Sequence, residues 1–110
     1  MKNKTPIDIL VEKGYEDVIV FRNPDYTNAL IGLTDNYNAV YDYDLMVKWL
    51  IKHENMDFEE AEDFISYNDS FYCGEHYPVI FYGDEAEIDD IESFYKIVFT
   101  RIEDLPNKKN

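Results

Sequence analysis

Hydrophobic positions at the start of the chain follow a helical pattern. Apolar residues at positions 7, 10 and 11 share one face of a helix. Thr5 is suited to the N-cap, and Pro6 to the first helical position, because proline needs no hydrogen-bond partner for its nitrogen there. Gly14 can adopt the left-handed conformation that ends many helices. The pattern therefore predicts a first helix from Pro6 to about Gly14.

Three short segments rich in β-branched and aromatic residues follow this helix. They are Asp17–Phe21, Ala29–Thr34 and Ala39–Tyr43. Turn-forming residues separate them, at positions 23–25 and 35–38. The short connections predict three strands in an antiparallel meander.

Two helices come next, each with a start signal. Leu45, Met46, Trp49 and Leu50 recur at helical spacing, and Asp42 or Asp44 can cap this helix. The second helix opens with the capping-box pattern D-x-x-E, formed by Asp57 and Glu60. Its inward residues are predicted to be Phe58, Ala61, Ile65 and Phe64.

The last third of the chain predicts two further strands, Tyr77–Tyr82 and Phe94–Ile102. Pro78 stands near the start of the first, where strands tolerate proline. We therefore predict one α+β domain over residues 1–110, with two to three helices packed on one face of a small antiparallel sheet of four to five strands. Residues 103–110 are expected to fray.

Composition and charge narrow the classes of partner. The 110 residues include ten Tyr, seven Phe and one Trp, which indicate a folded chain despite a net charge of −14. A pI near 4.2 argues against direct binding to nucleic acid or to anionic membranes, because both repel carboxylates. A single cysteine, the absence of an apolar leader and the lack of a long apolar run predict a cytoplasmic protein.

The acidic residues are concentrated in one part of the chain, away from the basic residues. No Lys or Arg occurs from His53 to Tyr95, a window with fourteen of the 24 acidic residues. From Glu59 to Asp63, four carboxylates occupy about 6 Å of helix axis. That density is close to the one charge per about 1.7 Å of duplex DNA. Two readings remain open: the acids keep the protein soluble, or they bind a basic partner.

The binding hypothesis assigns a surface to these acids and to the tyrosines among them, because tyrosine is enriched at protein interfaces. The predicted partner-binding residues are Glu59, Glu60, Glu62, Asp63, Asp69, Tyr72, Glu75, Tyr77, Tyr82, Asp84, Glu85, Glu87, Asp89, Asp90 and Glu92. The alternative is that about half of the tyrosines face the core.

Catalytic and metal-binding patterns are weak. Cys73, His76 and His53 make three candidate zinc ligands, where a structural site takes four. Cys73 and His76 also lack an identifiable third residue to orient the histidine as a catalytic base. The sequence has no phosphate-binding glycine loop and no ordered calcium loop. We expect a protein without catalytic activity or cofactor, with a small metal-dependent enzyme as an alternative.

Residues 29–82 resemble a group of small proteins of Firmicutes and of their phages and plasmids. The resemblance is carried by Ile31-Gly32, Ala39–Asp44, Glu59-Glu60-Ala61, Tyr67-Asn68 and Pro78-Val79-Ile80. Group members often have a basic residue after the Tyr-Asn pair, where this chain has Asp69-Ser70-Phe71. The resemblance implies a mobile-element setting rather than an activity, and positions 83–102 lie beyond the shared core.

Setting and charge together suggest a similarity to anti-CRISPR proteins, several of which mimic nucleic acid. Their targets have grooves lined with Arg and Lys. The leading hypothesis is therefore an inhibitor, without enzymatic activity, of a basic host protein, with a Cas effector nuclease as the first candidate. An immunity protein or antitoxin that covers a basic toxin is an alternative.

Overall fold

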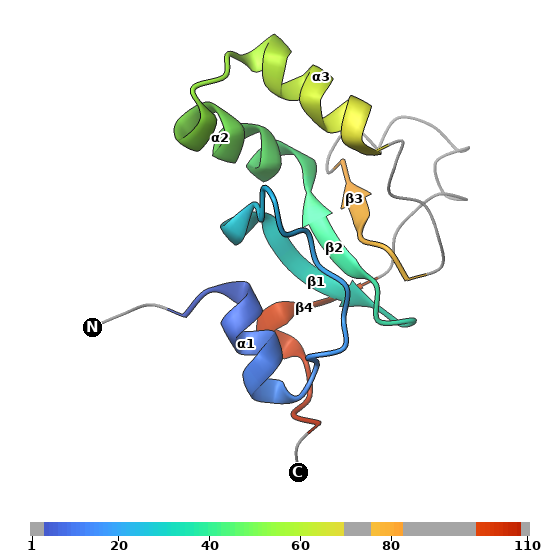
Figure 1. Cartoon of the computed structure of the whole chain (residues 1–110). Coiled ribbons are helices and arrows are strands. Elements are labelled where there is room, and N and C mark those ends of the chain that lie inside the picture. Colours follow the sequence, from blue (N-terminus) through green and yellow to red (C-terminus); the bar gives the residue numbers. More distant parts are fainter. Residues whose placement is uncertain (1–3, 70–75, 83–98, 109–110) are drawn as a thin grey trace.

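The computed structural model describes residues 4–69, 76–82 and 99–108. Within them, three α-helices and a four-stranded sheet confirm the α+β class (Figure 1). The helices are α1 (Pro6–Lys13), α2 (Tyr43–Glu54) and α3 (Phe58–Asp69), and the strands are β1 (Leu30–Thr34), β2 (Ala39–Asp42), β3 (Val79–Phe81) and β4 (Phe99–Arg101). Two 3₁₀ turns, η1 (Thr27–Ala29) and η4 (Ile102–Asp104), precede β1 and follow β4.

The first helix begins and ends as predicted. The Thr5 hydroxyl accepts a hydrogen bond from the Asp8 N–H, and the Asp8 carboxylate accepts one from the Thr5 N–H, both at 3.1 Å. Gly14 ends α1 with φ of 96°, in the left-handed region. These two signals are local, so the sequence alone was sufficient to find them.

The sheet has the strand order β3-β2-β1-β4 and is mixed rather than antiparallel. Strand β1 is antiparallel to both β2 and β4, but β3 is parallel to β2. The physical reason is the long connection: the chain leaves β2 through α2 and α3 and returns beside β2 in the same direction. The antiparallel prediction was therefore wrong for this pair.

Asp17–Phe21 is not a strand, which corrects a second prediction. The segment runs as an irregular connection between α1 and η1. Its last residue is anchored by a side chain instead of a neighbouring strand, because the Phe21 N–H donates to the hydroxyl of Tyr41 at 3.1 Å. The β-branched composition was compatible with a strand, but none of the four described strands pairs with this segment.

The segment after β4 packs against α1, in contrast to the predicted frayed tail. The Lys13 ammonium donates to the carbonyl oxygens of Ile102, Glu103 and Leu105 at 2.7–3.3 Å. Leu105 is buried. Of the predicted strand Phe94–Ile102, residues 99–101 form β4, Ile102 begins η4, and residues 94–98 lie outside the described part.

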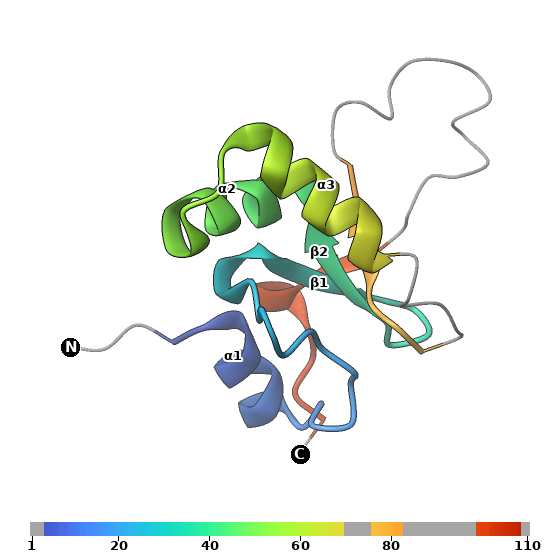
Figure 2. The same ribbon diagram turned by 45° about the horizontal axis from the view of Figure 1, so that its top comes forward.

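One hydrophobic core joins the helices to the sheet. Tyr41 of β2 and Leu50 of α2 are completely buried, and Ala61 and Ile65 of α3 pack into the same cluster. Figures 1 and 2 show α2 and α3 side by side at one end of the sheet and α1 at the other end, near η4. Among the described helices, none is long and apolar enough to cross a membrane.

Candidate interaction surface

The turn from α2 into α3 is held rigidly by local hydrogen bonds. Asn55 ends α2 in the left-handed conformation, with φ of 58°. The Asp57 carboxylate accepts from the Glu60 N–H at 2.8 Å, and the Glu60 carboxylate accepts from the Asp57 N–H at 2.9 Å. This is the capping box that the sequence predicted. It fixes the direction in which the first turn of α3 projects its side chains.

The predicted acids of α3 divide into two kinds. Glu60 belongs to the capping box, and Glu62 accepts a hydrogen bond from the Tyr43 hydroxyl at 3.2 Å. Glu59 and Asp63 are exposed and have no ion pair or hydrogen bond from their carboxylates within the described residues. Because they are four positions apart, they lie one above the other on the same helix face.

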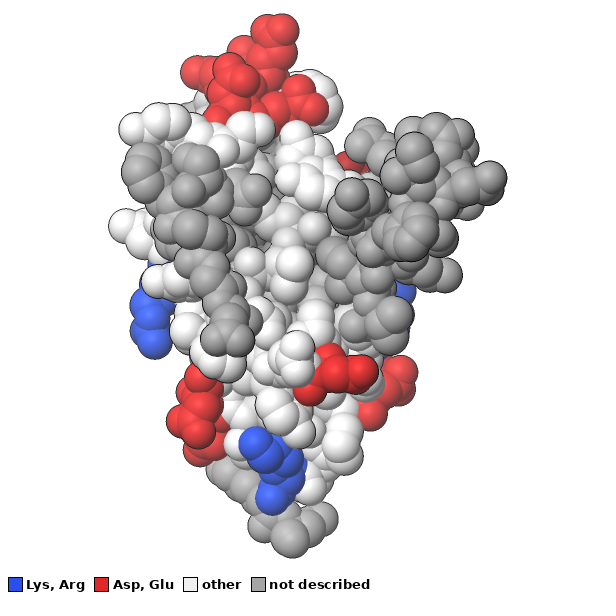
Figure 3. Space-filling model, turned by 90° about the vertical axis from the view of Figure 1, so that its right-hand side faces the viewer, with Lys and Arg blue, Asp and Glu red and all other residues white. Residues whose placement is uncertain are grey.

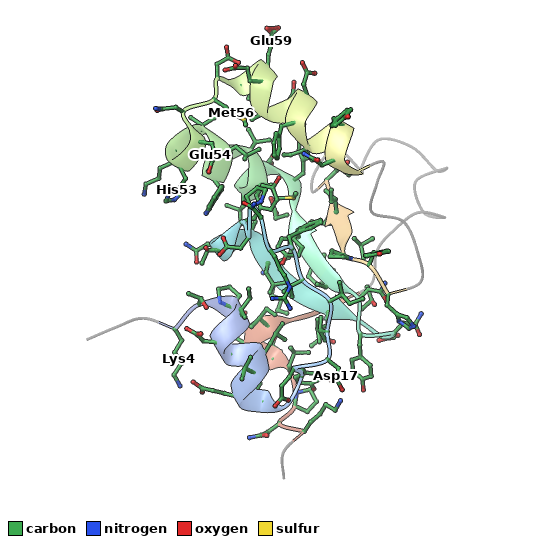
Figure 4. All side chains as sticks on the ribbon, viewed as in Figure 1. Lys4, Asp17, His53, Glu54, Met56 and Glu59 are labelled. Atoms are coloured by element: carbon green, nitrogen blue, oxygen red, sulfur yellow. The ribbon has the colours of Figure 1, made fainter. Side chains whose placement is uncertain are left out.

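We define the acidic corner as Glu54, Asp57, Glu59, Glu60 and Asp63. All five residues are exposed, and they come from the end of α2, the turn and the first half of α3. Figure 4 shows Glu54 and Glu59 at the end of the molecule formed by these two helices. In Figure 3, acidic atoms gather at this same upper end. The acidic corner thus draws its residues from both helices and from the turn between them.

An exposed aromatic residue accompanies the acidic corner. Phe58, the first residue of α3, has 56% of its surface exposed. The sequence pattern predicted Phe58 to face inward, and this prediction was wrong. The inward positions of α3 are taken by Ala61 and Ile65, so the first turn points Phe58 toward solvent. A large exposed ring beside carboxylates is typical of a contact surface.

Tyr43 links two of the predicted site residues. Its ring lies 4.8 Å from the ring of Tyr82, and its hydroxyl donates to Glu62. The structure therefore brings Tyr82 and Glu62 together on either side of Tyr43. Sequence reasoning did not include Tyr43 in the site, although it lies in the segment Ala39–Asp44 that carries the family resemblance.

Tyr77 lies at the other end of β3 from Tyr82. Its carbonyl oxygen accepts from the Asn38 amide at 2.9 Å, which places it beside the β1–β2 turn. The two tyrosines are five positions apart along extended chain, or roughly 16 Å. The structure thus places Tyr77 and Tyr82 in different surroundings, the first beside Asn38 and the second beside Tyr43.

The remaining predicted contact residues are not placed. Asp69 is the last residue of α3, and its side chain lies outside the described part. The others outside the described residues are Tyr72, Glu75, Asp84, Glu85, Glu87, Asp89, Asp90 and Glu92.

Of the candidate metal and nucleophile residues, the structure describes His53 and His76, which lie in different surroundings. The His53 ring packs on Trp49, with centroids 4.6 Å apart. His76 instead lines a surface hollow with Tyr37 and Lys108. Cys73 lies outside the described residues. Within the described ranges, no three His, Cys, Asp or Glu side chains are grouped as metal ligands.

Few basic side chains balance the acids where the structure describes both. The one ion pair in residues 4–69, 76–82 and 99–108 joins Lys4 to Glu12 at 2.7 Å, on α1. Figure 4 places Lys4 at the end of the molecule opposite Glu59. Within these residues, the acidic corner therefore has no ion pair.

Comparison with known proteins gives no match to any family model, curated protein or solved structure. The resemblance to small mobile-element proteins therefore stays a prediction.

Proposed function

We propose that this protein is a non-enzymatic inhibitor that binds a basic, nucleic-acid-handling host protein through its acidic corner. The partner's site is a groove lined with Lys and Arg, of the kind that normally holds phosphates. The mobile-element resemblance makes a CRISPR effector nuclease the first partner to test.

The pair Glu59 and Asp63 carries this proposal. Two like charges at positions i and i+4 destabilise a helix by about 0.2–0.5 kcal/mol. Neither carboxylate stabilises the described fold by a hydrogen bond or an ion pair. In a complex with a basic partner, each carboxylate would pair with a cationic side chain, and this attraction would outweigh the repulsion between the two carboxylates.

Phe58 supports an interface rather than a purely solubilising surface. Solubility requires charge, but it does not require an exposed aromatic ring beside the charges. At a protein interface such a ring supplies buried apolar area, while the surrounding carboxylates steer the encounter. Long-range steering of this type weakens as salt screens the charges.

The test is titration of a purified Cas effector nuclease with the wild-type protein and with the variant Glu59→Lys/Asp63→Lys. We expect the reversal to weaken binding by at least tenfold in low salt, and salt to weaken wild-type binding steeply. The matched control is Glu103→Lys/Asp104→Lys, which changes the net charge equally on η4. It should retain most of the affinity.

Two results would count against the proposal, the first against the acidic corner and the second against the CRISPR assignment. An equal loss of affinity in both double variants would show that binding depends on the net charge of the protein and not on the acidic corner. If the effector binds neither wild type nor variant, the same titration against other basic nucleic-acid enzymes and toxins of the host tests the acidic corner without the CRISPR assignment.

A further inference from the structure

Two tyrosine rings hold the ammonium group of a lysine at the end of the molecule opposite the acidic corner. The Lys108 Nζ lies 5.1 Å from the ring centre of Tyr15 and 5.0 Å from that of Tyr37. The two rings are 5.9 Å apart and inclined by 47°. Both distances are within the range of a cation–π interaction, so the two rings share one cation.

Tyr37 occupies its place at a conformational cost. It stands in the turn between β1 and β2 with φ of 66°, a left-handed conformation in which Asn or Gly is far more common than an aromatic residue. The Tyr37 N–H donates to the Thr34 carbonyl at 2.9 Å, so the turn itself needs only the backbone. The ring is 53% exposed and contributes little to the core. The turn thus presents an aromatic ring where its geometry favours Asn.

Lys108 is not required to dock its own segment. The Lys108 backbone N–H donates to the Lys13 carbonyl at 2.7 Å, and the Pro106 carbonyl accepts from the Tyr15 hydroxyl at 2.8 Å. Together with the hydrogen bonds from the Lys13 ammonium, these contacts hold the segment through its main chain. The Lys108 side chain can therefore leave the rings while the segment stays in place.

The space around the rings is large enough for a second side chain. A hollow of about 400 Å³ is lined by Tyr15, Tyr37 and Lys108, together with Asp17, Asn36 and His76. This volume is within the usual range for ligand pockets. Asp17 adds a carboxylate, which favours a cationic ligand over a neutral one. Figure 4 shows Asp17 far from Glu59, so this hollow is distinct from the acidic corner.

We propose that Tyr15 and Tyr37 form a binding site for an alkylammonium group, which Lys108 fills in the free protein and which a lysine side chain of a partner protein fills in a complex. Lys108 indicates the class of ligand, because its ammonium group already lies against both rings in the free protein. It also makes the site self-occupied, so a partner's lysine must displace Lys108 to bind. This site is independent of the proposed function at the acidic corner.

The experiment uses the full chain and the probe Nα-acetyl-lysine N-methylamide, with the norleucine analogue as a neutral probe that has the same four side-chain carbons but no ammonium group. Binding is followed by NMR through the ring resonances of Tyr15, which every tested variant keeps and which are assigned by their loss in Tyr15→Phe. We expect Lys108→Ala to bind the lysine probe about tenfold more tightly than wild type, because the probe then no longer competes with an internal ammonium group that contacts two rings. The norleucine probe should cause no saturable shift.

Two further variants make the test specific. Lys108→Arg keeps a cation that stacks on aromatic rings, and it should behave like wild type. Lys108→Ala/Tyr37→Asn removes one ring while suiting the left-handed turn, and it should lose the gained affinity. The proposal is overturned if Lys108→Ala binds no better than wild type. Equal binding by Lys108→Ala with and without the Tyr37 ring, or equal binding of the norleucine probe, also overturns it.

Discussion

The hydroxyl of Tyr41 accepts a hydrogen bond from the backbone N–H of Phe21, 3.1 Å away, while their rings pack with centroids 4.6 Å apart. Tyr41 is completely buried in β2, and Phe21 is buried in the connection that precedes η1. One side chain therefore does what a neighbouring strand would otherwise do, because it satisfies a main-chain donor and covers the ring beside it.

Tyr41→Phe should destabilise the fold. The substitution keeps the ring but leaves the Phe21 N–H without its buried acceptor, a loss of about 1–3 kcal/mol in the free energy of unfolding. Urea denaturation of both proteins measures it. The control is Tyr67→Phe, since Tyr67 is 68% exposed and its substitution should change stability by less than about 0.5 kcal/mol. Equal stability of Tyr41→Phe and wild type would refute the assignment.

Stability should also fall in alkaline solution because of Tyr41. Burial, with a smaller contribution from the charge of Asp25, raises the pKa of Tyr41 to about 12, against the Phe21 hydrogen bond, which lowers it. Above pH 10 the unfolded chain loses this proton while the folded chain retains it, so the folded state loses up to about 3 kcal/mol between pH 10 and 12.

The control for this pH dependence is again Tyr41→Phe, which has no phenol to titrate. Its stability should decline less over the same range. Some decline should remain, because burial and the nearby Tyr37 also raise the pKa of Tyr15. Thermal denaturation from pH 8 to 12 gives the comparison, and parallel curves for the two proteins would exclude Tyr41 as the source.

Gly32→Ala should destabilise the sheet. A Cβ at position 32 would collide with the carbonyl oxygen of Thr100 and the ring of Phe99 on β4. Gly32 pairs with Arg101 in this ladder, so relief requires β4 to move away from β1. We expect a loss of about 1–3 kcal/mol in the free energy of unfolding, as for other overpacked sites. Ser66→Ala, on the exposed side of α3, is the matched control and should be nearly neutral.

Substitution of Asp57, which caps α3, should change stability more than substitution of Glu59 in its first turn. Asp57→Ala removes the cap and should cost about 1 kcal/mol. Glu59→Gln should change stability by less than about 0.5 kcal/mol, because the lost attraction to the helix N-terminus is offset by relief of the repulsion from Asp63. Chemical denaturation distinguishes the two. A large loss in Glu59→Gln would mean that this carboxylate has a structural role and would weaken the case for the acidic corner.

Local signals were the part of the fold that the sequence predicted well. Thr5, Gly14 and the Asp57–Glu60 pair each act within one turn of helix, so their chemistry is visible in a few adjacent letters. The hairpin of β1 and β2 was predictable for the same reason, because turn residues separate two apolar segments. The segment Asp17–Phe21 was mispredicted because its partner, Tyr41, is distant in sequence and contacts it with a side chain.

The candidate site was predicted in part. Charge alone marked Glu59, Glu60 and Asp63 as contact residues, but it did not mark Glu54 and Asp57 as part of that surface. The sequence could not show that Glu62 has a structural partner. That partner is the hydroxyl of Tyr43, which belongs to a different helix.

By itself, the sequence determined the helices, their caps and the excess of negative charge, because these depend on residue type and short spacing. Only the tertiary structure decided that β3 runs parallel to β2 and that Lys108 reaches two tyrosines from distant segments. The physical reason is that such contacts join residues far apart in the chain, and their geometry is set by how the whole core packs rather than by any local pattern.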